Sequence, residues 1–156
     1  MGTVDTPAQQ GIGAGAHGLA EAQESLESML DSARRAGLSM IIRPGRAPAA
    51  VVDAERMRRH LALAVLPNVR LATEEGVWVL LMPGKPFAAE GTDLEAGLKD
   101  FVDALREYAD AWEEHVHTAP NHQGHWALVQ LVRLSSDEQL VSGLAVGRGT
   151  RHGGPN

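Results

Sequence analysis

Apolar residues recur at three- and four-residue spacing in two long segments, which is the spacing of an amphipathic helix. The first segment is followed by Gly37, which is expected to end the helix. Its apolar positions are Leu19, Ala22, Leu26, Met29, Leu30 and Ala33. The second segment reaches about His115, and its stripe is expected to face the core or a dimer seam. Its apolar positions are Leu94, Leu98, Phe101, Val102, Leu105, Tyr108, Ala109 and Trp112.

Two pairs of short apolar runs predict β-hairpins. LSMII and APAAVV flank the turn sequence Arg43-Pro44-Gly45-Arg46, and VWVLLM and PFAAE flank Pro83-Gly84-Lys85. Pro and Gly at adjacent positions are typical of a tight turn between strands. The order in the first half is therefore helix, hairpin, helix.

Helix starts are indicated by side chains that accept hydrogen bonds from backbone N–H groups. Asp53 is expected to cap a helix from Ala54 to about Leu66, which Pro67 closes. Thr92 with Glu95 has the spacing of a capping box before the long helix.

The C-terminal part contains two further short segments. Residues 126–134 (WALVQLVRL) are expected to form a helix, although a strand remains open. Ser135 with Glu138 repeats the capping-box spacing before a short terminal helix. The chain from Gly143 onward is rich in small and polar residues and is expected to be a tail.

These elements define an α+β protein with four parts. Residues 1–15 are expected to be a mobile arm because they contain too little apolar surface to offset the entropy of ordering. Residues 16–66 form a helix-hairpin-helix module, residues 67–142 a second hairpin-plus-helix module, and residues 143–156 the flexible tail.

Charge is distributed unevenly, although the formal net charge of the 156 residues is -6. Residues 34–60 contain seven arginines against Asp53 and Glu55, whereas residues 90–114 contain nine carboxylates against Lys99 and Arg106. Such asymmetry is typical of a chain in which one part meets a polyanion and the other a different partner. Two solvated faces remain the alternative.

The composition excludes several classes of protein. There are no cysteines, which excludes disulfides, thiolate metal sites and cysteine nucleophiles. No apolar run is long enough to cross a bilayer, and the N-terminus lacks the pattern of a signal peptide. We therefore expect a cytoplasmic protein without a membrane contact.

Four histidines lie within eleven residues, at His115, His117, His122 and His125. A loop could gather them around a metal ion, with Glu113 or Glu114 as a base, which leaves a metal-dependent enzyme as a distant alternative. His115 and His117 are two residues apart, which on a helix directs them to different sides. No other catalytic constellation is present, so we expect no enzyme activity and no metal or other cofactor.

The sequence from 20 to 61, AEAQESLESMLDSARRAGLSMIIRPGRAPAAVVDAERMRRHL, resembles the Phd/YefM antitoxins of toxin-antitoxin pairs. It has the family's first helix, its strand, basic turn and strand, and the following helix in the same order. The resemblance also implies an initial strand near residues 16–19. It further implies a homodimer or higher oligomer that binds operator DNA and represses its own operon.

The segment GVWVLLMPGKPFAAEGTDLEAGLKDFVDALREY, residues 76–108, more loosely resembles HicB-like antitoxins. This similarity implies an ordered module that binds a cognate toxin. An interaction protein of the HicB-like kind, without DNA binding, is the alternative to the Phd/YefM interpretation.

Candidate binding residues follow from charge and from these resemblances. Guanidinium groups match phosphate oxygens, so Arg43 and Arg46 are the first candidates for DNA contact. Arg56, Arg58 and Arg59 form a second patch near the next helix. An acidic helix could cover the active site of a basic toxin by charge complementarity. The candidates for that contact are Asp103, Glu107, Asp110, Glu114 and Trp112.

Overall fold

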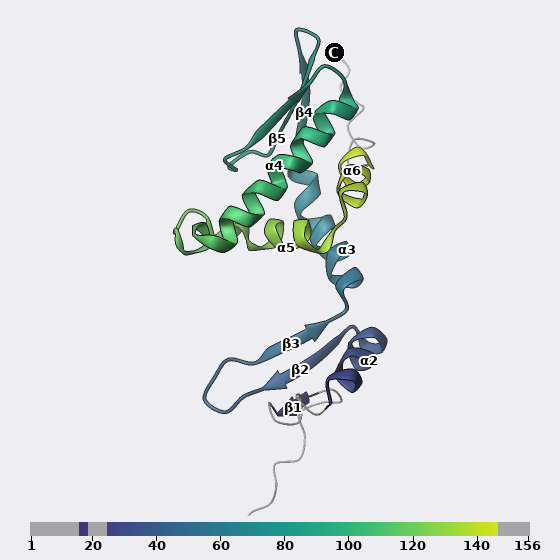
Figure 1. Ribbon diagram of the computed structural model, residues 1–156, viewed down its shortest axis with the longest axis vertical. Coiled ribbons are helices and arrows are strands. Elements are labelled where there is room, and N and C mark those ends of the chain that lie inside the picture. Colours follow the sequence, from purple (N-terminus) through teal and green to yellow (C-terminus); the bar gives the residue numbers. More distant parts are fainter. Residues whose placement is uncertain (1–15, 19–24, 147–156) are drawn as a thin grey trace, which may run out of the picture. The chain divides into compact units, whose positions relative to one another are not determined.

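A computed structural model describes residues 16–18 and 25–146, with side chains from residue 25 onward. It shows the predicted α+β fold, with two three-stranded sheets and five α-helices in the described chain (Figure 1). The chain divides into two compact units, residues 1–56 and 57–156. The expected arm at 1–15 lies outside the described residues.

The first unit contains α2 (Leu26–Ala36), whose inner side buries Met29 and Ala33. Gly37 ends this helix as predicted: its φ is 86°, and its N–H donates to the carbonyl of Ala33. Glycine adopts this left-handed conformation without the steric penalty of a β-carbon. The predicted start of the helix, residues 19–24, lies outside the described residues.

The first sheet has the order β1-β2-β3. The predicted hairpin is confirmed as β2 (Leu38–Ile42) and β3 (Ala49–Val52), which pair antiparallel with Leu38 opposite Val52. The strand expected near residues 16–19 is confirmed as β1 (Ala16–Gly18), parallel to β2.

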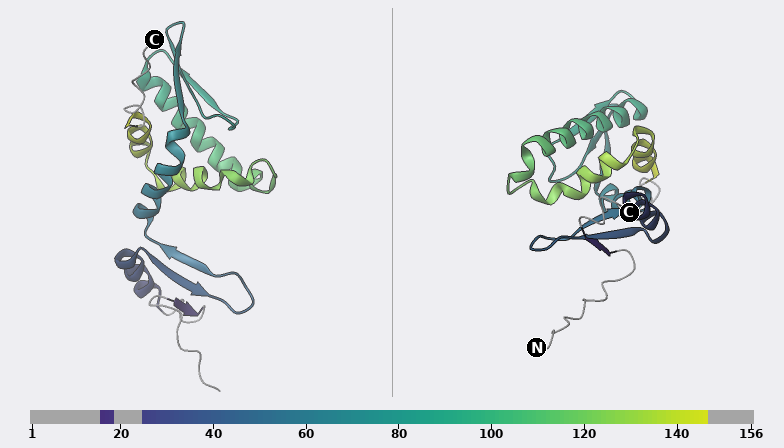
Figure 2. Two further views of the ribbon diagram at one scale, coloured as in Figure 1. Left: turned by 180° about the vertical axis from the view of Figure 1, so that it is seen from behind. Right: turned by 60° about the horizontal axis from the view of Figure 1, so that its bottom comes forward.

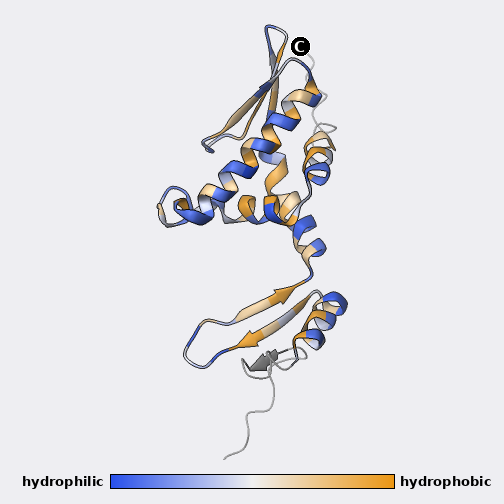
Figure 3. Ribbon diagram, in the orientation of Figure 1, coloured by the Kyte–Doolittle hydropathy of each residue, from blue (hydrophilic) through white to orange (hydrophobic). Residues whose placement is uncertain are grey.

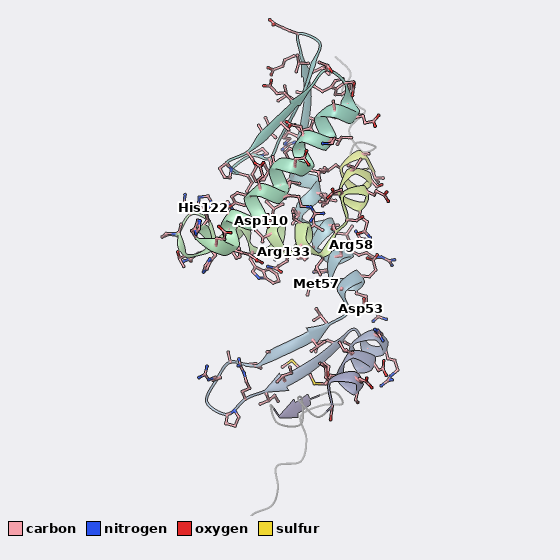
Figure 4. The ribbon with its side chains drawn as sticks, in the orientation of Figure 1. Asp53, Met57, Arg58, Asp110, His122 and Arg133 are labelled. Carbon is pink, nitrogen blue, oxygen red and sulfur yellow. The ribbon has the colours of Figure 1, made fainter. Side chains whose placement is uncertain are left out.

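Helix α3 (Ala54–Val65) begins after Asp53, whose Oδ1 accepts a hydrogen bond from Arg56 N at 2.8 Å. This is the predicted N-cap, and the 3-10 turn η1 (Leu66–Asn68) with Pro67 follows. The division between the units falls at 56/57, near the start of α3 and ten residues before the boundary expected from the sequence. Asp53 and Met57 in Figure 4 mark this region.

The second unit begins its sheet with β4 (Arg70–Glu74), a strand that the sequence analysis missed. The next two strands, β5 (Val77–Leu81) and β6 (Ala88–Gly91), form the predicted hairpin. Lys85 N closes its turn on the carbonyl of Met82 at 3.0 Å. The sheet is antiparallel throughout, in the order β4-β5-β6.

Helix α4 (Leu94–Glu114) lies along one face of this sheet (Figures 1 and 2). The close approach is possible because Gly91 and Gly97 lack side chains: a β-carbon on Gly91 would lie 2.2 Å from Gly97 N. The predicted cap at Thr92 is wrong by one residue. Asp93 is the N-cap, and its carboxylate accepts from Ala96 N at 2.8 Å.

Two short helices complete the second unit. Residues 126–134 form a helix, α5 (Trp126–Leu134), and α6 (Asp137–Val146) follows. The predicted capping box is again displaced by one residue, because Ser136 and Gln139 exchange side-chain hydrogen bonds with each other's backbone N–H groups. Helix α6 continues four residues into the segment expected to be tail, and the rest of that segment lies outside the described residues.

One apolar core holds the second unit together, and the predicted α4 stripe is part of it. Phe101 is fully buried, and Phe87 packs against Phe101 and Tyr108 with ring centroids 5.7 Å and 5.2 Å apart. Figure 3 shows the resulting division of α4 into polar and apolar sides, and the apolar character of α5. None of the described helices is long and apolar enough to cross a membrane.

Candidate functional site

The arginine turn lies at one end of the β2-β3 hairpin. Arg46 N donates to the carbonyl of Arg43 at 3.2 Å, and Gly45 has a φ of 68°. Pro at the second position and a left-handed Gly at the third are the requirements of a type II turn. Arg46 is exposed, whereas Arg43 is half-buried and its buried Nε atom has no hydrogen-bond partner among the described residues.

The other three candidate arginines belong to α3. Arg56 lies beside Gly37, at the end of the hairpin opposite the turn, where Asp53 N also donates to the carbonyl of Gly37 at 3.1 Å. The five residues of β2 span roughly 16 Å, so Arg56 is well separated from the arginine turn. Arg58 and Arg59 fall in the second unit. The candidate arginines therefore form a turn set and an α3 set.

The candidate acidic residues Asp103, Glu107, Asp110 and Glu114 follow one another at spacings of four, three and four residues on α4. This spacing places them on one side of the helix, and all four are exposed. They define the acidic stripe. It lies on the opposite side of α4 from the buried positions in the core.

Basic side chains next to the acidic stripe partly neutralise it. Asp103 accepts from Lys99 Nζ at 3.0 Å, and this hydrogen bond and charge raise the pKa of Lys99. Arg133 of α5 lies 2.8 Å from Glu113 and 3.9 Å from Asp110 (Figure 4). The four-residue spacing of Lys99 and Asp103 on a helix could have indicated their ion pair. The ion pairs of Arg133 join two different helices, and no spacing within one segment indicates them.

Trp112 differs from the other candidate partner-binding residues because it is half-buried and hydrogen-bonded within the unit. Its Nε1 donates to the carbonyl of His122 at 2.9 Å, and its ring packs against His117. These contacts hold the segment between α4 and α5 against the end of α4. Trp112 therefore has a structural role in the second unit.

The histidines lie at the C-terminal end of α4 and in the following segment. His122 Nδ1 lies 2.8 Å from the Tyr108 hydroxyl, and His125 Nδ1 is hydrogen-bonded to the same hydroxyl. One hydroxyl proton cannot serve both rings, so one imidazole must donate from Nδ1. Among the described residues, no three His, Asp or Glu side chains have a geometry that could hold a metal ion.

Burial changes the protonation behaviour of this histidine-tyrosine cluster, formed by Tyr108, His122 and His125. Burial raises the pKa of Tyr108, so that its hydroxyl keeps its proton. Burial also lowers the pKa of His125, with smaller contributions from the charges of Lys85 and His122. This lowered pKa favours the neutral form of the His125 ring, which suits a structural hydrogen bond.

A groove in the second unit, which the sequence did not reveal, has a volume of about 580 Å³ and lies between α3 and α6. Leu63 and Val146 line it, and each is 79% exposed. Arg58 also lines this groove, which places one member of the α3 set beside an apolar surface. Helix α3 was predicted from its cap at Asp53 and from Pro67 rather than from a stripe of apolar positions, so nothing in that prediction indicated this groove.

Comparisons with known proteins identify the fold. The structure is similar to a crystal structure of the antitoxin part of a proposed toxin/antitoxin system from Syntrophomonas wolfei subsp. wolfei, with a TM-score of 0.67 and 16% sequence identity. The match covers 81% of this chain and 94% of the Syntrophomonas chain. Since neither unit alone contains 81% of the residues, the match includes parts of both units. No protein-family model and no curated protein matches the sequence. The chain thus has an antitoxin-type fold.

Proposed function

We propose that the chain is an antitoxin of a type II pair, which neutralises a cognate toxin by protein-protein binding and represses its own operon by binding operator DNA. The observation that carries the proposal is the similarity of fold to an antitoxin, which extends over both units. The Phd/YefM resemblance of residues 20–61 adds the DNA-binding half of the proposal. No catalytic step is part of this function.

DNA binding and dimerisation are assigned to the first unit. The arginine turn projects Arg46 from the end of a hairpin, and guanidinium groups bind phosphate oxygens with matched geometry. Arg56, the member of the α3 set that belongs to this unit, provides further positive charge. A dimer is expected because a module of about 50 residues buries too little surface to be stable alone.

Toxin binding is assigned to the second unit. The acidic stripe on α4 is exposed and is matched in charge to a protein that itself must attract nucleic acid. Both partners, a toxin and the operator, are found in the cytoplasm, which is where we place the protein.

Copurification tests this function. The chain should be coexpressed with the protein encoded by the reading frame adjacent to its own, and the tagged chain should retain that protein through gel filtration. The same complex should retard DNA from upstream of the two frames more strongly than shuffled DNA of equal length. Retention without retardation would support the HicB-like alternative, and failure of both would reject the proposal.

A further inference from the structure

Strand β4 is an edge strand of the second sheet. In the described part of the chain it pairs only with β5, in the register Arg70 opposite Leu81 through Glu74 opposite Val77. Four of its five residues are exposed, and Leu71 is half-buried. An uncovered edge presents backbone N–H and C=O groups that can pair with another strand.

The β4-β5 turn determines which backbone groups of β4 point outward. Only Glu75 and Gly76 lie between the paired residues Glu74 and Val77, and their φ angles are 51° and 84°. Such a two-residue turn closes with a hydrogen-bonded pair, and hydrogen-bonded and non-hydrogen-bonded pairs then alternate along the strand. The backbone groups of Leu71 and Thr73 therefore point away from β5.

The charges of β4 are complementary to those of a second copy of the same strand. Its sequence, RLATE, has Arg70 and Glu74 at equal distances from Ala72. An antiparallel pair of two β4 strands centred on Ala72 places Arg70 of each strand opposite Glu74 of the other. Both side chains are exposed, and neither forms an ion pair with any described residue.

Backbone geometry favours the same register. In a pair centred on Ala72, Leu71 of each copy lies opposite Thr73 of the other. All the outward N–H and C=O groups of these residues then form hydrogen bonds between the two strands. Registers centred on Leu71 or Thr73 satisfy fewer of them. Two of the other sheet edges lack this symmetry, since β3 (AAVV) carries no charge and β6 (AAEG) carries only Glu90.

We propose that β4 docks against β4 of a second copy of this chain, antiparallel and centred on Ala72, to give a continuous six-stranded sheet. This contact lies in the second unit and is distinct from the dimerisation assigned to the first. It also makes the outer faces of the two sheets continuous; on this face Val77 and Val79 are half-buried and Leu81 is exposed. Two-fold symmetry requires a self-complementary surface, and the β4 sequence provides one.

A cysteine at the proposed axis tests the contact directly, because the chain has no cysteine of its own. Two Ala72 residues would form a non-hydrogen-bonded pair with Cα atoms about 4.5 Å apart, within the range of a disulfide. Full-length Ala72→Cys should therefore form a disulfide-linked dimer under oxidised glutathione. The matched control is Ala88→Cys, an exposed position on the same sheet face but on β6.

Charge exchange in the Ala72→Cys background provides the second arm. Arg70→Glu should slow cross-linking roughly tenfold, because it replaces two attractive pairs with two repulsive pairs. Adding Glu74→Arg should restore the rate, since the pairs are re-formed with opposite polarity. A merely misfolded variant would not be rescued in this way, and far-ultraviolet circular dichroism of each variant checks the fold.

Each result of the cross-linking experiments either supports or overturns the proposed β4 contact. Faster cross-linking of Ala72→Cys than of Ala88→Cys, with loss and rescue by the two charge changes, supports the β4 contact. Equal rates for the two cysteine variants would overturn it, as would cross-linking that ignores Arg70→Glu. Cross-linking of Ala72→Cys only to a copurified toxin would also overturn it, because the edge would then serve a different partner.

Discussion

At the scale of single residues, Arg43 and Arg46 occupy the first and last positions of one turn but differ in burial. If each binds one phosphate, a dimer makes four such contacts. Each phosphate contact contributes about 0.9 to the slope of log affinity against log salt concentration for duplex DNA. The double variant Arg43→Ala/Arg46→Ala should therefore flatten that slope by up to about 3.6.

The single variant Arg46→Ala is the matched control for this prediction. It should flatten the slope by about half as much, and because its side chain is exposed it should change the free energy of unfolding by less than about 0.5 kcal/mol. Fluorescence anisotropy at several salt concentrations measures both slopes. Slopes equal to that of the unchanged protein would mean that the turn does not touch DNA.

His125 predicts how the stability of the second unit depends on pH. Because burial lowers its pKa below the ordinary value of 6.5, the unfolded chain takes up a proton before the folded chain does as the pH falls. The contribution of the neutral His125 ring to the free energy of unfolding is complete above pH 6.5 and is lost as the pH falls through the pKa of the folded state. Urea unfolding should therefore show lower stability at pH 5 than at pH 7.5.

His125→Gln should reduce this pH dependence, since glutamine keeps a hydrogen-bonding group but does not titrate near neutrality. The control is His115→Gln, because His115 is exposed, pairs with Glu114 and is not a member of the histidine-tyrosine cluster. A pH dependence that persists unchanged in His125→Gln would show that this imidazole is not its source.

At the scale of elements, α4 combines a buried stripe with the acidic stripe. If the acidic stripe binds toxin, Asp103→Lys/Glu107→Lys should slow association by about tenfold or more at low salt, because opposite charge accelerates encounter. The effect should diminish as salt is added. Stopped-flow association with the purified toxin measures both.

The first unit offers a matched control for the α4 variant. Glu27→Lys/Asp31→Lys changes the net charge equally and has the same four-residue spacing on an exposed helix side, but on α2. It should leave toxin association unchanged. Equal slowing by both pairs would indicate a general effect of net charge, and would contradict a specific role of the acidic stripe.

Local signals in the sequence predicted most elements but not their contacts. The α4 stripe, Gly37 and the two Pro-Gly turns each depend on backbone or side-chain preferences of neighbouring residues, and the structure confirms them. Strand β4 was missed because Leu71 is its only strongly apolar residue, and its pairing with β5 supplies the order.

Contacts between distant residues had no local signal. Arg106 bridges α4 to the α5-α6 connection through Asp137 at 2.7 Å and the carbonyl of Ser135. The Tyr108 hydroxyl likewise joins two rings that lie 14 and 17 residues further along. Such pairs depend on how the chain returns to α4, which spacing within one segment cannot reveal.

At the scale of the whole molecule, charge follows the two units only in part, because the arginine-rich segment 34–60 crosses the division at 56/57. Five positive charges in excess lie within residues 34–60, whereas residues 90–114 carry seven negative charges in excess. The contact division at 56/57 assigns the arginine turn to one unit and the acidic stripe to the other. We therefore expect variants of the turn and of the stripe to lose different functions.

Growth of cells that express the protein encoded by the adjacent reading frame tests antitoxin function most directly. That protein alone should arrest growth, and coexpression of this chain should restore it. Arg43→Ala/Arg46→Ala should restore growth equally well, whereas Asp103→Lys/Glu107→Lys should restore it poorly at matched expression. Growth arrest that the unchanged chain does not relieve, although it is expressed and folded, would contradict the proposal that it is an antitoxin.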